Sequence, residues 1–394
     1  MRTSYYTRSA RQVRQETIAL LHRHLHPPDY SKHCSSWWVL SCLVLIAAAR
    51  LSLSAVATLR GEQSRETLRQ ALLATLPDYQ RTLRQIPRLL RASLPRGLRK
   101  RFQKGCQRRR YPLAIDLHAV PYYKREAKPP PRVRKGKPLP GTAYSHQYAT
   151  AALLRKGRYY TVALTPYLPG EDLATLVKRL LQQATANGFP PRYLLIDRYF
   201  WSVDVFRYLQ QARYPFMMPL LARGKKASAA GGPTGTRAFL HGHKSGWYIY
   251  ELTKHHSKKK ARVKIGVHRH NEGGKRGRHG RWAWAFAVWR MPVSSVAWLH
   301  ESYRRRFRIE SSYRLLEAAR GRTSSRNEAL RLWYVMVAVI MLNRWLELRR
   351  EGSRRSSVLE HWWNQLLATL TFVLLVESYA DVAEAATAEF PLRE

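Results

Sequence analysis

The sequence predicts an α/β protein in which a mixed strand-and-helix domain lies between helical segments. Two patterns support this fold class. Apolar residues recur at helical spacing through residues 1–100 and again after Pro292, whereas the middle of the chain alternates short apolar runs with turn residues. A length of 394 residues with 45% hydrophobic content allows a large core and two or three domains.

Residues 1–100 are predicted to form a small basic helical domain. Leucines recur at helical spacing before Pro77, and a second series from Leu83 to Leu94 has arginines on its other face. Basic helical modules of this kind can bind DNA, and a purely structural role is an equally good interpretation. The Arg-rich segment 96–110 is expected to be a charged linker into the next domain.

Residues 111–221 contain elements in the order typical of a ribonuclease-H-like α/β fold. The expected elements are a strand at 113–120, a Pro-rich surface loop at 124–140, a hairpin at 144–164, a helix at 171–186, a strand at 193–197, a helix at 202–212 and a strand at 216–220. In that topology the first and fourth strands are neighbours. Asp116 and Asp197 should therefore come together near strand ends, where α/β sheets commonly form their sites.

The rest of the chain divides into an insertion and two helical segments. Residues 222–294 are predicted to be an inserted, mainly β subdomain with a small-residue loop at 225–235 and strands at 247–253, 262–269 and 282–291. Residues 295–350 are predicted to be the helices of the catalytic domain that carry Glu310, and residues 351–394 a C-terminal helical segment. The apolar stripe that contains Trp333 and Trp345 is expected to be core rather than a cofactor site.

The charge of the chain points to a polyanionic partner. Lys and Arg number 70 against 25 Asp and Glu, a formal charge of +45, and the excess runs through the whole sequence. Nucleic acid is the usual partner of such a surface, and a basic membrane-surface protein is the alternative. The first thirty residues lack a secretory core, and the apolar run 37–49 is shorter than the roughly 20 residues of a membrane span. We therefore expect a cytoplasmic, nucleoid-associated protein without a membrane partner. Three scattered cysteines support neither disulfides nor a cysteine zinc site.

Three carboxylates lie in settings where an acid needs an explanation: Asp116 and Asp197 among apolar strand residues, and Glu310 in a basic helical stretch. Desolvating a charge costs several kcal/mol unless the charge is paired or bound to metal. Carboxylates of this kind can hold two Mg²⁺ or Mn²⁺ ions roughly 4 Å apart for phosphodiester cleavage. Asp116 is expected to bridge the ions. His118, on the same strand face, is expected to hydrogen-bond to the ligands rather than to bind metal.

The helix that bears Glu310 carries a further pattern. Tyr303, Arg306, Glu310 and Arg314 are three or four residues apart and share one helical face. A salt-bridged surface explains this pattern as well as a functional site does. Beside a metal site, Tyr303, Arg306 and Arg314 would hold the backbone phosphates of the bound DNA.

These segments together resemble the DDE transposases of insertion sequences, in the group with a β-strand insertion before the catalytic Glu. The resemblance rests on Ile115 to His118, Leu194 to Phe200 and the Tyr303-x2-Arg306-x3-Glu310 signature. It implies metal-dependent cleavage at the terminal inverted repeats, strand transfer into target DNA, and a homodimer in a synaptic complex. The family carries a basic residue seven places after the Glu, where this chain has Glu317; Arg314 lies on the appropriate face to replace it.

The insertion is rich in Trp, which permits two interpretations. Trp282, Trp284, Trp289 or Trp298 could stack on a flipped base, as the resemblance implies for one Trp of this subdomain. Most of them are expected to be core, since Trp282, Trp284 and Phe286 alternate along one strand face. The chain as a whole also has two alternatives: a catalytically silent DNA-binding protein derived from a transposase, and a related nuclease or resolvase without strand transfer.

Overall fold

The computed structural model describes residues 5–103, 110–123, 130–155, 158–226, 228, 231–254, 256–271, 281–323, 325–348 and 363–371. The chain forms two compact units, which we consider separately. One comprises residues 107–309, and the other comprises residues 1–106 together with 310–394. The helical N-terminal segment therefore shares its unit with the C-terminal part of the chain.

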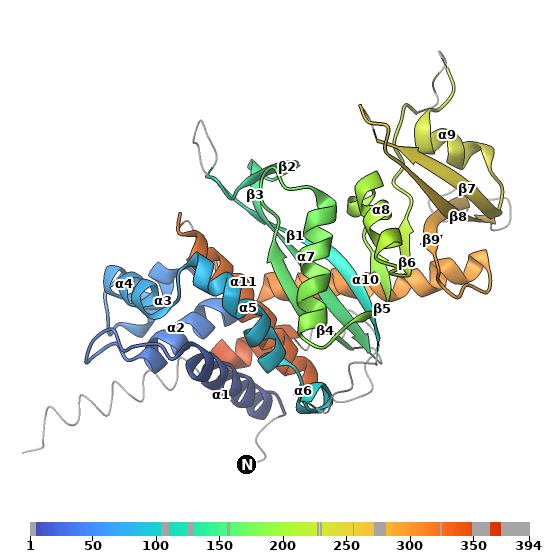
Figure 1. Ribbon diagram of the computed structural model, residues 1–394. Helices are drawn as coiled ribbons and strands as arrows, with labels where there is room; N and C mark the ends of the chain where they lie inside the picture. The colour runs from blue at the N-terminus through green and yellow to red at the C-terminus, as the bar shows by residue number, and fades with distance from the viewer. Residues whose placement is uncertain are drawn as a thin grey trace, which may run out of the picture. The chain divides into compact units, whose positions relative to one another are not determined.

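The unit of residues 107–309 is built on one mixed sheet of nine described strands (Figure 1). The strands are β1 (Tyr111–Pro121), β2 (Arg134–Leu139), β3 (Thr142–Arg155), β4 (Arg158–Pro166), β5 (Pro191–Ile196), β6 (Phe216–Pro219), β7 (Gly246–Thr253), β8 (Lys260–Asn271) and β9 (Arg281–Trp289). Strands β4, β3, β1, β5 and β6 follow one another across the sheet, with β1, β5 and β6 parallel and β3 antiparallel to both of its long partners. This is the ribonuclease-H-like arrangement that the sequence predicts.

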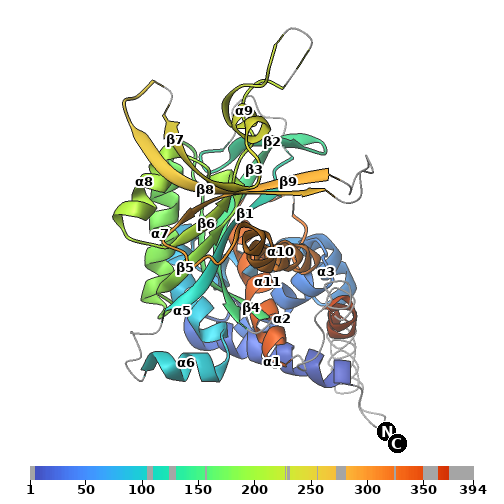
Figure 2. The same ribbon diagram turned by 90° about the vertical axis from the view of Figure 1, so that its right-hand side faces the viewer.

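Helices cover both faces of this sheet. Helices α7 (Leu173–Ala186) and α8 (Val203–Gln211) lie on one face, and α10 (Val296–Ala318) begins on the opposite face (Figure 2). The apolar stripe of α7 that includes Leu176, Leu180 and Leu181 is fully buried, and the Asp172 side chain caps the helix by accepting from the N–H groups of its first turn. The leucines that the sequence places at helical spacing are therefore the face that α7 packs against the sheet.

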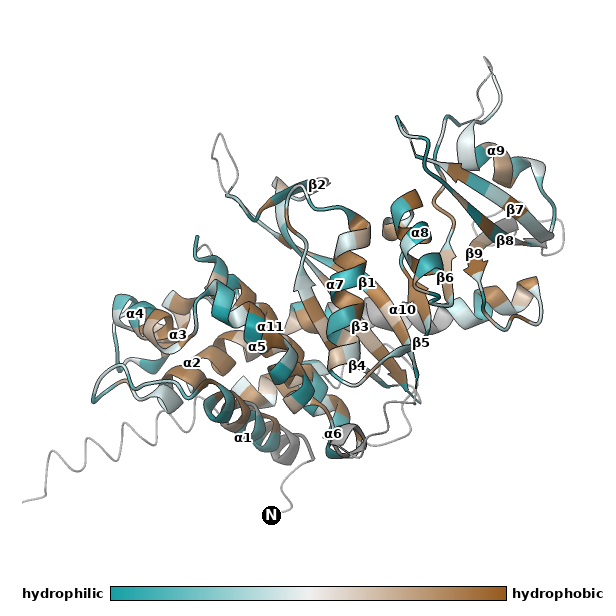
Figure 3. Ribbon diagram, viewed as in Figure 1, coloured by the Kyte–Doolittle hydropathy of each residue, from teal (hydrophilic) through white to brown (hydrophobic). Residues whose placement is uncertain are grey.

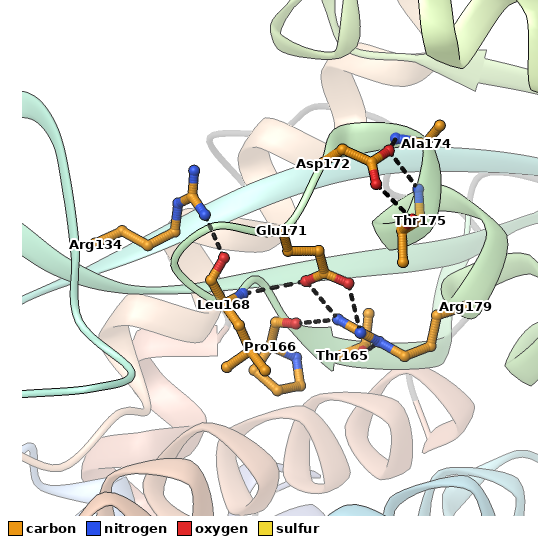
Figure 4. A network of polar contacts seen from close by, with 9 residues as sticks. All are labelled: Arg134, Thr165, Pro166, Leu168, Glu171, Asp172, Ala174, Thr175 and Arg179. Carbon is orange, nitrogen blue, oxygen red and sulfur yellow. Dashed lines mark hydrogen bonds and ion pairs between the residues drawn. The ribbon is translucent and has the colours of Figure 1, made fainter.

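A polar network fixes the start of α7 to the end of β4 (Figure 4). The Arg179 guanidinium donates to the Thr165 hydroxyl at 2.6 Å, to the Pro166 carbonyl at 2.5 Å and to Glu171 Oε1 at 2.6 Å. Glu171 in turn accepts from the N–H of Leu168 at 3.2 Å. Because Arg179 is matched by an acid and by neutral acceptors, we assign it a structural role.

The insertion continues the same sheet. Strand β9 pairs antiparallel with β6, with Phe216 opposite Trp289, and β8 and β7 follow outward. The three predicted strands of this segment are thus confirmed. Two local predictions are wrong: β2 occupies part of the expected Pro-rich loop, and α6 (Arg96–Gln103) occupies the start of the expected linker. Helix α9 (Gly235–Gly242), which begins at the last residue of the expected small-residue loop, is not predicted by the sequence.

The other unit is helical. Its N-terminal part contains α1 (Tyr5–Leu25), α2 (Ser36–Ala48), α3 (Leu53–Arg60), α4 (Arg65–Thr75), α5 (Tyr79–Ser93) and α6, and α11 (Glu328–Leu348) packs against α1, α2 and α5. Residues 363–371 are also helical, and the Trp363 indole N–H donates to the Leu315 carbonyl at 2.8 Å. The remainder of the predicted C-terminal helical segment lies outside the described residues.

Helix α11 forms the centre of this helical unit, and it is hydrophobic nearly all round (Figure 3). Trp333, Met336, Val337 and Ile340 are fully buried, which confirms that the apolar stripe is core. In the described part of the chain α11 is the single helix long and apolar enough to cross a membrane, and 94% of its apolar window is buried in the structure. Helices α2 and α3 meet the same criterion only as a pair bent by 118°.

Candidate functional site

Asp116 lies on β1, and Asp197 directly follows the neighbouring strand β5. Strands β1 and β5 are parallel with Ile115 paired to Ile196, and the Asp197 N–H donates to the Ile115 carbonyl at 3.1 Å. Asp116 follows Ile115 on β1, and Asp197 follows Ile196, the last residue of β5. The predicted convergence of these two carboxylate-bearing positions at the carboxyl end of β5 is therefore present in the fold.

The two acids differ in burial and in local bonding. Asp116 is buried within β1, and its Oδ1 accepts from the N–H of Leu117 at 2.8 Å. Asp197 is half-buried and begins the 3₁₀ helix at Arg198–Phe200, where its Oδ2 accepts from the Tyr199 N–H at 3.4 Å. One acid is thus set rigidly within the sheet, and the other lies at the point where the chain leaves it.

His118 lies two residues beyond Asp116 on β1 and is also buried. It pairs in register with Tyr148 of β3, while Asp116 pairs with Thr150. Alternate strand residues share a face, so His118 and Asp116 project on the same side of the sheet. A hydrogen-bonding role of His118 beside the two aspartates stays a prediction.

Tyr303 does not lie on a DNA-accessible surface. Its side chain is 1% exposed, its hydroxyl donates to the Ile196 carbonyl at 3.0 Å, and its ring lies 5.0 Å from that of Phe286. Ile196 immediately precedes Asp197. The expected contact of the Tyr303 phenol with DNA phosphates is therefore wrong, because the hydroxyl is committed to holding α10 against the end of β5.

The first half of α10 packs on the strands of the insertion. The Trp284 ring lies 4.6 Å from that of His300 and 6.3 Å from that of Phe286, to which it is nearly parallel. On β8, Gly266 leaves space that Leu299 fills, since a Cβ there would approach Leu299 Cδ1 to 2.4 Å. Phe286 and Gly266 thus form part of the surface on which α10 packs. The alternation of aromatic residues along β9 is the sequence pattern that indicates a buried face here.

The other predicted stacking residues have mixed environments. Trp289 is half-buried, lies nearly parallel to Phe216 at 6.4 Å, and carries the Arg290 guanidinium 4.7 Å above its ring. Trp298 is half-buried, and the side chain of Trp282 lies outside the described set. Trp284 and Trp289 therefore have the partners expected of core residues. Base stacking by any of these residues stays a prediction.

The remaining predicted residues of α10 fall in its second half or near its middle. Glu310 and Arg306 are helical, but their side chains are not among those that the structure describes; Arg314 is exposed. Glu310 also belongs to the other compact unit, so its position relative to the two aspartates stays a prediction. Among the described side chains, no three His, Cys, Asp or Glu lie close enough together to bind a metal ion. The side chain of Glu310 is outside this described set.

The donor chemistry of the pair nevertheless suits a hard cation. Asp116 and Asp197 offer carboxylate oxygens, which are the ligands that Mg²⁺ and Mn²⁺ prefer. Their backbones are fixed by the β1–β5 ladder, so the two positions are held in place without a ligand.

Comparison with known proteins identifies the class. Residues 149–344 match the family model described as transposase DDE domain, which includes Asp197, Tyr303 and Glu310 but begins after Asp116. The match over residues 149–344 supports a DDE transposase. No curated protein matches the sequence. Among solved structures it is similar to a piggyBac transposase synaptic complex with hairpin DNA, with 13% identity, a TM-score of 0.47, and coverage of 100% of this chain and 81% of that one.

Proposed function

We propose that this protein is a metal-dependent transposase that cuts DNA at the ends of an insertion sequence and joins the freed ends to target DNA. The observation that carries the proposal is the adjacency of Asp116 on β1 and Asp197 at the end of β5, secured by the hydrogen bond from the Asp197 N–H to the Ile115 carbonyl. The match to a transposase DDE domain over residues 149–344, which include Asp197 and Glu310, also supports the proposal.

Asp116, Asp197 and Glu310 would hold the divalent ions. Bound ions of this kind polarise a phosphodiester and stabilise the charge of the entering and leaving oxygens. The contribution of the chain is to fix the carboxylates: β1 immobilises Asp116 in the sheet, and the turn into the 3₁₀ helix places Asp197 at the strand end.

Helix α10 would deliver the third carboxylate. The Tyr303 hydroxyl anchors the helix on the residue before Asp197. Glu310 follows seven residues later, almost two turns along the same helical face. Tyr303 is thus a positioning residue in this scheme, and it acts through the placement of α10 rather than through contact with substrate.

DNA would be held by the basic surface. The formal charge of +45 favours a phosphate backbone as partner. Arg314, which is exposed, and Arg306 would contact phosphates on either side of Glu310. Two element ends would be joined in a synaptic complex of two copies of the chain.

The test uses DNA that carries the inverted repeats flanking the reading frame. Asp116→Asn, Asp197→Asn and Glu310→Gln should each reduce Mg²⁺-dependent nicking by more than about 100-fold, since even outer-shell changes around metal sites reach that loss. DNA affinity should change little. Asp204→Asn is the matched control, because Asp204 lies in the same unit and pairs with Lys254 at 2.6 Å on the surface.

The products distinguish the alternatives. Nicking followed by joined target DNA supports the transposase. Nicking without joined products supports a nuclease or resolvase, and DNA binding without Mg²⁺-dependent nicking supports a silent DNA-binding protein. Retained cleavage in any of the three acid variants would overturn the assignment of that acid.

A further inference from the structure

A cavity in the helical unit has an excess of positive charge. It has a volume of about 170 Å³ and lies where α1, α5 and α6 meet α11. The lining residues are Glu16, Ala19, Leu20, Arg23, His24, Ala92, Arg96, Arg99 and Arg344. All of them belong to one compact unit, so the cavity is complete within it.

One cation of the lining is already neutralised. Arg344 is 7% exposed, forms an ion pair with Glu16, and lies 3.0 Å from a carboxylate oxygen of Glu347. It also donates to the carbonyls of Ser93 and Leu94 at 3.4 and 3.5 Å. Arg344 and its two acids therefore form a structural group with a formal charge of −1, so the charge of Arg344 is fully compensated.

The other cations are not balanced in this way. Arg23, Arg96 and Arg99 make no ion pair with any acid in the described part of the chain. Arg23 comes from the last turn of α1, while Arg96 and Arg99 come from α6. Three guanidinium groups from two helices thus line one cavity, and Glu16, its single acidic residue, is already bound to Arg344.

Three nitrogen atoms of the lining residues are buried without a hydrogen-bond partner: Arg344 Nε, Arg99 Nε and His24 Nδ1. Arg99 Nε and His24 Nδ1 are shielded from solvent, and neither makes a hydrogen bond in the structure. A buried donor left in this state destabilises the protein, so an acceptor inside the cavity would stabilise the fold. Burial, and then the positive charges of Arg88, Arg23, His26 and Arg99, hold the pKa of His24 below its ordinary value. The field at this point therefore favours an anion.

We propose that this cavity binds a phosphate group, with Arg23 and Arg99 as its principal ligands. Guanidinium forks match the geometry of phosphate oxygens. A space of about 170 Å³ exceeds the roughly 30 Å³ of one water several-fold, which is enough for a tetrahedral oxyanion. The phosphate belongs either to a DNA backbone or to a free phosphate or nucleotide. The cavity and the two aspartates belong to different compact units, so phosphate binding here does not depend on the cleavage reaction.

The test compares two double variants of the full-length protein. Arg23→Ala/Arg99→Ala removes the two ligands, and Arg65→Ala/Arg84→Ala removes two exposed arginines of the same unit outside the cavity, so that net charge is matched. Inorganic phosphate at constant ionic strength should raise the Tm of the wild type and of the control variant. The cavity variant should show no rise, and its phosphate affinity should fall roughly tenfold or more, since each charge-assisted bond contributes about 1.5–3 kcal/mol.

A DNA arm separates the two sources. If a DNA phosphate occupies the cavity, phosphate should compete with a short duplex, and the slope of log affinity against log salt should fall by about 2 in the cavity variant beyond the fall in the control. Equal slopes in the two variants, with phosphate binding still lost in the cavity variant, assign the site to a free phosphate or nucleotide. Equal phosphate stabilisation of all three proteins, or of none, would overturn the proposal. Arg99→Lys, which keeps the charge, provides a folded variant if the double variant does not fold, and it should still weaken phosphate binding.

Discussion

Replacing Tyr303 with Phe would remove one hydroxyl and leave the packed ring in place. That hydroxyl donates to the Ile196 carbonyl at 3.0 Å in a fully buried setting. A buried acceptor left unsatisfied costs about 1–3 kcal/mol. In a unit of this size each kcal/mol lowers Tm by roughly 2–4 °C. The variant should therefore be measurably less stable, and its α10 should be less firmly held next to Asp197.

The assay combines three measurements on the full-length protein. Thermal unfolding should show the lower Tm, hydrogen exchange should be faster in peptides covering 296–303, and Mg²⁺-dependent nicking should fall while the salt dependence of DNA binding stays unchanged. Tyr123→Phe is the matched control, because Tyr123 lies in the same unit and its side chain is 66% exposed. A Tyr303→Phe protein with wild-type stability and hydrogen exchange but weakened DNA binding would refute the positioning role. That result would instead support a contact between the Tyr303 hydroxyl and a DNA phosphate.

Three further outcomes follow from the described side chains. Arg314→Ala should weaken DNA binding for all sequences and reduce the salt slope by about 1, measured by titration at several salt concentrations, because the exposed guanidinium would contact phosphate. Gly266→Ala should destabilise the protein by about 1–3 kcal/mol in urea unfolding, since its Cβ would overlap Leu299; an unchanged midpoint would contradict this packing. Burial raises the pKa of the Cys42 thiol from 9.0 to about 12. In a Cys106→Ser protein, Cys42 should therefore resist alkylation at pH 8 until the protein unfolds. The contribution of Cys42 to stability should fall as the pH rises from about 9 towards 12.

The neighbouring aspartates could be predicted because their positions depend on local signals. Short apolar runs and turn residues locate β1 and β5, and the order of elements determines which strands are adjacent. Asp116 and Asp197 then follow from their positions at the same level of two parallel strands. The strand positions and their order in the sheet can both be predicted without knowledge of any side-chain contact.

The errors occurred where tertiary context outweighs composition. Strand β2 contains Pro138 and several cations, which favour a loop, yet it pairs with the first residues of β3 alone and lies at the end of the strand order, where a missing N–H is tolerated. The buried bond from Tyr303 to Ile196 joins residues 107 positions apart. Helical spacing located Tyr303 on a face, but it could not show whether that face is turned to DNA or to the protein.

The same long-range pairing changes how the insertion is understood. Because β9 returns to pair with β6, it extends the sheet that carries β1 and β5, and it ends only seven residues before α10 begins. Along that helix Leu299 packs over Gly266, His300 against Trp284, and Tyr303 against Phe286. Strands β8 and β9 are therefore the surface on which the first two turns of α10 rest, and the Tyr303 hydroxyl reaches Ile196 only because that surface is continuous with β5. Removal of the insertion should therefore change the position of Tyr303, because the insertion carries these contacts.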